Sequence, residues 1–183
     1  MSDPLLHKYA PVDRVGGLLF AATRAFALAG GLILVALTLM SLASIAGRSL
    51  LSAPVPGDYE LIQLGIAVAV TAFLPFCQMR GGHVLVDFFT ANARPAVRGA
   101  LDALGATLVG IAAATFTWRL AVGAVSLQQA NDQTTILEIP TWYAVGLMVP
   151  SFALLAAAGF YTAWQHWCGR LPEADRDAAG ARP

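Results

Sequence analysis

The chain has 183 residues, of which 57% are hydrophobic and 12% are charged, and its formal net charge is zero. Soluble domains carry about 25% charged residues, so this composition argues against an ordinary soluble protein. With no excess of positive charge and no recognisable nucleic-acid motif, a nucleic-acid-binding function is excluded as well.

Four long apolar runs predict an all-α membrane protein with four transmembrane helices. The runs lie at about residues 18–46, 60–79, 96–125 and 140–167. A run of about 18 or more apolar residues is long enough to cross a bilayer as a helix, and it leaves no polar face for water. We therefore expect a transmembrane domain over residues 18–168, between a cytoplasmic N-terminal segment, 1–17, and a disordered cytoplasmic tail, 169–183.

The first run has an alternative interpretation as a cleaved signal peptide. Its apolar stretch is too long for a signal-peptide core, and a polar segment of more than a dozen residues precedes it. We therefore expect this run to remain in the membrane as a helix.

The segment between the second and third runs predicts an amphipathic helix at the membrane surface. In a helix over residues 83–94, His83 and Asp87 share one face, one turn apart. Four apolar side chains share another face: Val84, Leu85, Phe88 and Phe89. The segment is too short to span a bilayer, so an interfacial helix is expected. An ordinary connecting loop is the alternative.

The distribution of Lys and Arg predicts that both termini are cytoplasmic. With that orientation, nine basic residues lie on the inner side and two on the outer side, which is a strong positive-inside bias. The nine are Lys8, Arg14, Arg24, Arg80, Arg94, Arg98, Arg170, Arg176 and Arg182, and the two are Arg48 and Arg119. Cys77 and Cys168 then lie near the cytoplasm, where thiols stay reduced, so no disulfide is expected.

The sequence offers no set of residues for catalysis, a cofactor or a metal. Its histidines, His7, His83 and His166, do not face one another inside the predicted helices, as a haem site requires. Two isolated cysteines do not supply the four ligands of a structural zinc site. There is also no C-x-x-C, phosphate-binding loop or G-x-S-x-G motif. We therefore expect no enzymatic activity and no cofactor.

Three charged residues within the predicted helices, Arg24, Asp102 and Arg119, need partners in a membrane. Glu60 and Arg119 lie toward the outer side, while Asp102 and Arg24 lie toward the inner side, so two helix-to-helix ion pairs are candidates. In the alternative, each side chain reaches its own headgroup region. No Asp or Glu lies at the centre of a span, so the chain lacks the coupling residue expected of a transporter that works alone.

Small residues in the first and third runs predict close approach of helices, either within the chain or against a partner. These residues are Gly30, Gly31, Ala106, Gly110, Ala113 and Ala114.

One stretch, from Glu60 to Asp87, resembles the small membrane subunit of tripartite ATP-independent periplasmic (TRAP) transporters, the DctQ-like family. An acidic residue opens the second span in that family, as Glu60 does here. An Arg-x-x-His-x-x-x-Asp-like signature then follows the span, and Arg80, His83 and Asp87 match it in this sequence.

A later stretch, Thr134-Thr-Ile-Leu-Glu-Ile-Pro140-Thr-Trp142, is similar to the family's entry to the fourth span. The order and spacing of the two stretches fit a four-span topology, and the resemblance covers about Leu18 to Trp167. The matching positions, which we expect at a partner or membrane interface, are Glu60, Arg80, His83, Asp87, Pro140 and Trp142.

The resemblance implies a sodium-coupled secondary transporter of the bacterial inner membrane. A periplasmic binding protein, the P component, would deliver an organic acid to a large membrane subunit, the M component. The M component would hold the substrate and sodium sites and would be a separate chain, while the present chain would brace it. A second class of function stays open, in which the chain is an independent small membrane protein, such as an assembly factor or a homo-oligomeric exporter.

Overall fold

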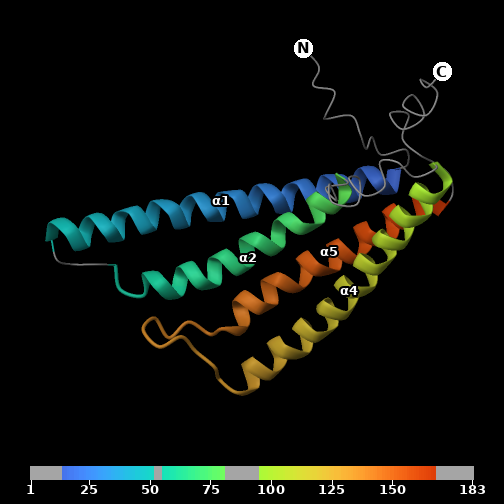
Figure 1. The fold of residues 1–183 in the computed structure, drawn as a ribbon. Coiled ribbons are helices and arrows are strands. Elements are labelled where there is room, and N and C mark those ends of the chain that lie inside the picture. The colour runs from blue at the N-terminus through green and yellow to red at the C-terminus, as the bar shows by residue number, and fades with distance from the viewer. Residues whose placement is uncertain (1–13, 52–54, 81–94, 168–183) are drawn as a thin grey trace, which may run out of the picture.

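A computed structural model describes residues 14–51, 55–80 and 95–167. These residues form four long helices, labelled as in Figure 1. Their bounds are α1, Arg14–Leu51; α2, Asp58–Met79; α4, Pro95–Gln129; and α5, Trp142–Trp167. All four are long and apolar enough to cross a membrane, which confirms the predicted all-α membrane fold. The predicted interfacial helix, residues 83–94, lies outside the described residues.

The helix ends follow local sequence signals. Pro95 occupies the first position of α4, where its missing N–H is not needed for a helical hydrogen bond. At the other end of α4, Asn131 has a positive φ of 52°. The N–H of Asn131 donates to the carbonyl of Gln128, and the N–H of Asp132 donates to the carbonyl of Leu127. This pair of bonds is a Schellman motif, which ends the helix with its last carbonyls satisfied.

The helices stand side by side in the order α1, α2, α5, α4, so that α1 and α4 form the two edges (Figure 1). Helix α2 packs against both α1 and α5, and α5 packs against both α2 and α4. In a closed four-helix bundle the first and last members of this series would also pack together. Within the described residues they do not, so the arrangement is an open row.

The contacts within the row are made mostly by small side chains. Eight of the ten buried hydrophobic residues are alanine, and this lets the helix backbones approach closely. The closest approach joins α4 to α5, where a Cβ placed on Gly159 would lie 2.9 Å from the Cα of Gly110. Gly30 of α1 lies against Ala69 and Ala72 of α2 in a similar way.

The small-residue prediction is thus confirmed for four positions, Gly30, Ala106, Gly110 and Ala113, all of which are buried. The other two positions lie outside the contacts between helices. A Cβ on Gly31 would meet nothing within 4 Å, and Ala114 is exposed on α4. The outer surface of the row instead exposes large apolar residues, among them Leu32 and Leu39 of α1 and Leu104 and Trp118 of α4.

Candidate functional site

The carboxylate of Glu60 joins the start of α2 to the connection between α4 and α5. Its Oε1 accepts a hydrogen bond from the N–H of Ile136 at 2.8 Å, and its Oε2 accepts one from the N–H of Leu137 at 3.0 Å. An ionised carboxylate is acceptor-only, so two backbone N–H groups suit both of its oxygens. We call this contact the Glu60 clasp.

Gly57 lies directly beneath the clasp and precedes the first residue of α2. It adopts a φ of +71°, in the left-handed region that glycine tolerates best. A Cβ at this position would collide with the side chain of Leu137. Glycine is therefore required both by the backbone conformation and by the side chain that rests on it.

The α4–α5 connection, residues 130–141, is held in shape by its own hydrogen bonds. Gln133 and Pro140 form an antiparallel bridge. Inside it, the N–H of Thr134 donates to the carbonyl of Ile139 at 3.0 Å, and the N–H of Ile139 donates to Oγ1 of Thr134 at 3.1 Å. The clasp therefore holds a loop that its own internal hydrogen bonds already shape.

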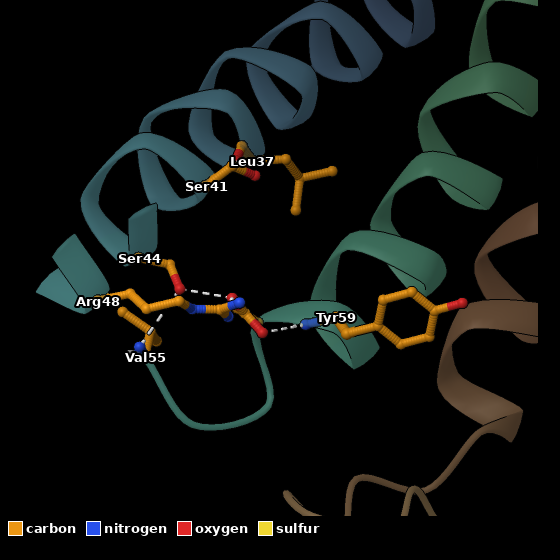
Figure 2. Close-up of polar contacts among 7 residues, drawn as sticks. Leu37, Ser41, Ser44, Arg48, Val55 and Tyr59 are labelled. Carbon is orange, nitrogen blue, oxygen red and sulfur yellow. Dashed lines mark hydrogen bonds and ion pairs between the residues drawn. The ribbon is translucent and has the colours of Figure 1, made fainter. Parts of the chain in front are cut away.

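A second polar cluster joins α1 to α2 at the same end of the row (Figure 2). The hydroxyl of Ser44 donates to Oδ2 of Asp58. The guanidinium of Arg48 lies 3.6 Å from the same oxygen, and Oδ1 of Asp58 accepts the N–H of Tyr59 at 2.7 Å. Together with the clasp, this cluster connects α1, α2 and the α4–α5 connection at one end. We call this the loop end of the row.

A buried polar pair joins α2 to α5 toward the opposite end. The side-chain amide of Gln78 donates to the hydroxyl of Thr162 at 3.2 Å, and both residues are buried. The hydroxyl of Thr162 in turn donates to the carbonyls of Ala158 and Gly159 at 3.0 Å. A polar side chain that crosses between two helices in this way stabilises their association in an apolar environment.

Arg80 directly follows the last residue of α2, at the end of the row opposite the loop end. Its N–H donates to the carbonyl of Phe76, and its guanidinium carbon lies 4.9 Å from the centre of the Phe76 ring, in a cation–π contact. The same ring lies 5.8 Å from that of Phe20 on α1. His83 and Asp87, which belong with Arg80 to the Arg-x-x-His-x-x-x-Asp-like signature, lie outside the described residues.

Pro140 and Trp142 introduce α5 at the loop end. The helix begins at Trp142, and Pro140 lies two residues earlier, where its carbonyl accepts the N–H of Tyr143. The ring of Trp142 stacks on that of Tyr143 with centroids 4.0 Å apart. This aromatic pair therefore lies at one end of a membrane-crossing helix, as side chains of a membrane interface do.

The candidate ion pair between Glu60 and Arg119 is wrong. Both oxygens of Glu60 are occupied by the α4–α5 connection. Arg119 is exposed on α4, which does not pack against α2. Nor does an ion pair join Arg24 of α1 to Asp102 of α4 in the part of the chain that the structure describes. Those two helices form opposite edges of the row.

The polar residues that matter most for the helix contacts were not all evident from the sequence. Ser44, Asp58, Gln78 and Thr162 join helices, yet none of them was predicted as a site residue. The signal that could identify Ser44 and Thr162 is a single hydroxyl within an otherwise apolar run. Such residues also bond their own helix, so the signal alone does not name a partner.

The chemistry of these clusters is structural. Their carboxylates, hydroxyls and amides bond one another or the backbone across helix contacts. Among the described residues, no three His, Cys, Asp or Glu side chains come together in a way that could hold a metal ion. The arrangement can connect helices and shape a loop.

Comparison with known proteins identifies the chain. The family model described as Tripartite ATP-independent periplasmic transporters, DctQ component, matches residues 37–169. The match covers well over half of the chain and includes the clasp, both polar clusters and all of α2, α4 and α5. Comparison with curated proteins and with solved structures gave no match. The chain therefore belongs to the DctQ family, the small membrane component of TRAP transporters.

Proposed function

We propose that this chain braces the large subunit of a sodium-coupled TRAP transporter that imports an organic acid. A periplasmic binding protein delivers the acid, and the large subunit moves it across the membrane. The family assignment supports a tripartite transporter as the setting. The large subunit and the binding protein are then the partners of this chain.

The observation that carries the bracing role is the open row. Its four helices are fixed to one another by small-residue contacts, the Glu60 clasp and the Gln78–Thr162 pair. The polar residues of these contacts are occupied within the chain. Two broad apolar faces and two edges remain for lipid or for another membrane protein. A subunit that stays fixed while its partner moves needs both features: helices held firmly to one another, and an apolar surface left free for the partner.

We place the protein in the bacterial inner membrane with both termini cytoplasmic. The start of α1 and the end of α5 lie at the same end of the row, opposite the loop end (Figure 1). The excess of Lys and Arg belongs to the end where α1 starts and α5 finishes, as the positive-inside rule expects. The loop end then faces the periplasm, toward the binding protein.

Reconstitution of the three components tests the bracing role. The large subunit is placed in proteoliposomes with or without this chain. The binding protein is then added together with a labelled dicarboxylate or sugar acid that the binding protein is known to bind. We expect uptake driven by an inward sodium gradient only when this chain is present. Equal uptake without the chain would contradict the proposal.

Copurification supplies the matching structural test. The large subunit should copurify in mild detergent with this chain at near one-to-one stoichiometry. Purification of this chain only with further copies of itself would favour the independent membrane protein instead.

A further inference from the structure

Arg119 of α4 is an exposed cation without a partner in the described part of its own chain. It takes part in no hydrogen bond or ion pair there, and its predicted partner, the carboxylate of Glu60, is occupied by the clasp. An exposed arginine at the end of a span would need no explanation, because its long stem reaches the headgroups. The depth of Arg119 therefore decides what it does.

The middle of α2 gives the level of the membrane centre. The 22 residues of α2, at about 1.5 Å each, extend about 33 Å, close to the roughly 30 Å of the hydrocarbon core. Its middle lies near Ala69. Helices α2 and α5 run in the same direction, and Gln78 of α2 bonds Thr162 of α5. Nine residues before Thr162 is Ala153, which places the centre of α5 beside Phe152.

The contact between α5 and α4 transfers this level to α4. The ring of Phe152 lies 5.5 Å from that of Phe116. The backbone of Gly110 lies against that of Gly159, which is six residues, or about 9 Å, from Ala153 on the side away from the loop end. Arg119 follows Gly110 by nine residues, or about 13.5 Å back toward the loop end. The Cα of Arg119 is therefore within about one helical turn of the membrane centre, on the side of the loop end.

The direction of α4 makes an escape to the headgroups unfavourable. Helical side chains lean toward the N-terminus of their helix. For α4 that direction leads away from the loop end and toward the membrane centre. Arg24 provides the contrast, because α1 runs the same way but Arg24 lies six residues, or about 9 Å, before Gly30, which packs against Ala69 and Ala72 near the centre of α2. The lean carries Arg24 toward its nearest interface.

The position of Arg119 around α4 directs it out of the row. Arg119 follows Gly110 by nine residues, or about 180° around a helix that turns roughly 100° per residue. Gly110 is the point of closest contact with α5, so Arg119 lies on the opposite side. The same exposed side carries Ala112, Thr115 and Ser126, whose small or weakly polar side chains suit contact with another helix.

We propose that this face of α4, comprising Ala112, Thr115, Arg119, Val122 and Ser126, binds the large transport subunit within the membrane. The large subunit presents a carboxylate to Arg119 there. The inference rests on the proposed function and adds to it the contact surface and its chemistry. A cation at this depth is costly unless an anion or a set of acceptors compensates it. The nearest lipid phosphates lie at the interface on the side of the loop end. The side chain of Arg119 leans in the opposite direction, toward the membrane centre.

Two substitutions test the electrostatic part of the contact. When the complex is purified in mild detergent, Arg119→Leu should lower the affinity for the large subunit at least about tenfold, because it leaves a buried carboxylate without its cation. Arg119→Lys, which retains the charge, should bind more tightly than Arg119→Leu. Arg24→Leu is the matched control and should bind as the wild type does. Equal binding by Arg119→Leu and the wild type would overturn the proposal.

Unfolding and loss of contact are separated by measurements on the isolated chain. Arg119→Leu should leave its melting temperature and elution volume unchanged, since Arg119 bonds nothing in the described part of the chain. If Arg119→Leu destabilises the isolated chain as much as it weakens the complex, the proposed intermolecular contact is wrong.

Crosslinking tests the location of the surface and distinguishes it from the proposed function. A photoreactive amino acid at Val122, one turn from Arg119, should crosslink to the large subunit in membranes. A crosslink only to lipid, or only to a second copy of this chain, would overturn the surface while copurification still supported the transporter role. If the wild-type chain does not associate with the large subunit at all, both proposals fail.

Discussion

Glu60 uses both of its carboxylate oxygens on the backbone N–H groups of a loop that lies 76 and 77 residues further along the chain. An acidic residue that begins a transmembrane helix also interacts favourably with the positive end of the helix dipole. In this protein the same side chain therefore stabilises the start of α2 and fixes the α4–α5 connection. A residue predicted to lie at a membrane or partner interface has a role within its own chain.

The clasp predicts a local effect of Glu60→Gln. A glutamine side chain has one acceptor oxygen, and its NH₂ group would face an N–H donor, so one of the two bonds is lost. Hydrogen exchange measured by mass spectrometry should become faster across residues 133–139 and stay unchanged in the centre of α5. Glu138→Gln is the control, because Glu138 is an exposed acid of the same loop. Equal exchange in the two variants would show that the clasp does not order the loop.

At the scale of the element, two glycines of α5 allow a matched comparison. A Cβ on Gly159 would meet the backbone of α4 at 2.9 Å, whereas a Cβ on Gly146 would meet nothing within 4 Å. Gly159→Ala should destabilise the protein by about 1–3 kcal/mol because the two helices must move apart. Gly146→Ala should be neutral or stabilising by up to about 1 kcal/mol, through its better helix propensity. Unfolding in detergent, followed by circular dichroism, measures both, and an equal effect would contradict the packing argument.

The buried pair of Gln78 and Thr162 predicts a measurable coupling between α2 and α5. A double-mutant cycle with Gln78→Ala and Thr162→Val should give a coupling energy of about 0.6 kcal/mol, the average for hydrogen bonds between transmembrane helices. Thr71→Val paired with Gln78→Ala serves as the control, because the hydroxyl of Thr71 bonds only carbonyls of its own helix. Additive effects of Gln78→Ala and Thr162→Val would show that the bond contributes nothing to helix association.

Each helix was predictable because its signal is local. A run of apolar residues is recognisable wherever it lies, and the four spans follow directly from such runs. The order of the helices in the row depends on which alanine and glycine faces meet, and the runs contain more of these faces than the contacts use. Gly31 and Ala114, for example, have the right size but lie outside the contacts.

The candidate site was less predictable because its contacts join distant parts of the chain. Glu60 was identified as important from its motif, but its partners are backbone groups, which carry no signature in the side-chain sequence. The Glu60–Arg119 ion pair was wrong for the same reason. Matching charges at similar depths indicate a pair only when the two helices are neighbours, and α2 and α4 are not.

At the scale of the whole molecule, the row predicts which residues are accessible from each side. In a chain with Cys77→Ser and Cys168→Ser, a cysteine at Glu138 should react with a membrane-impermeant maleimide in intact cells. A cysteine at Arg80 should react only after lysis, because Arg80 lies at the opposite end of α2 from the loop end. The reverse labelling pattern would invert the proposed orientation, and labelling of both positions in intact cells would contradict the membrane placement.

The two edge helices of the row are much longer than the two helices in its middle. Helix α1 has 38 residues and α4 has 35, compared with 22 in α2 and 26 in α5. At about 1.5 Å per residue, α1 is about 57 Å long, nearly twice the roughly 30 Å hydrocarbon core, and the usual tilt of about 20° does little to shorten it. Part of each edge helix must therefore stand outside the core or thicken the lipid around it. A subunit of this shape makes the transporter sensitive to bilayer thickness, so acyl-chain length is a variable that sets how its edges fit the membrane.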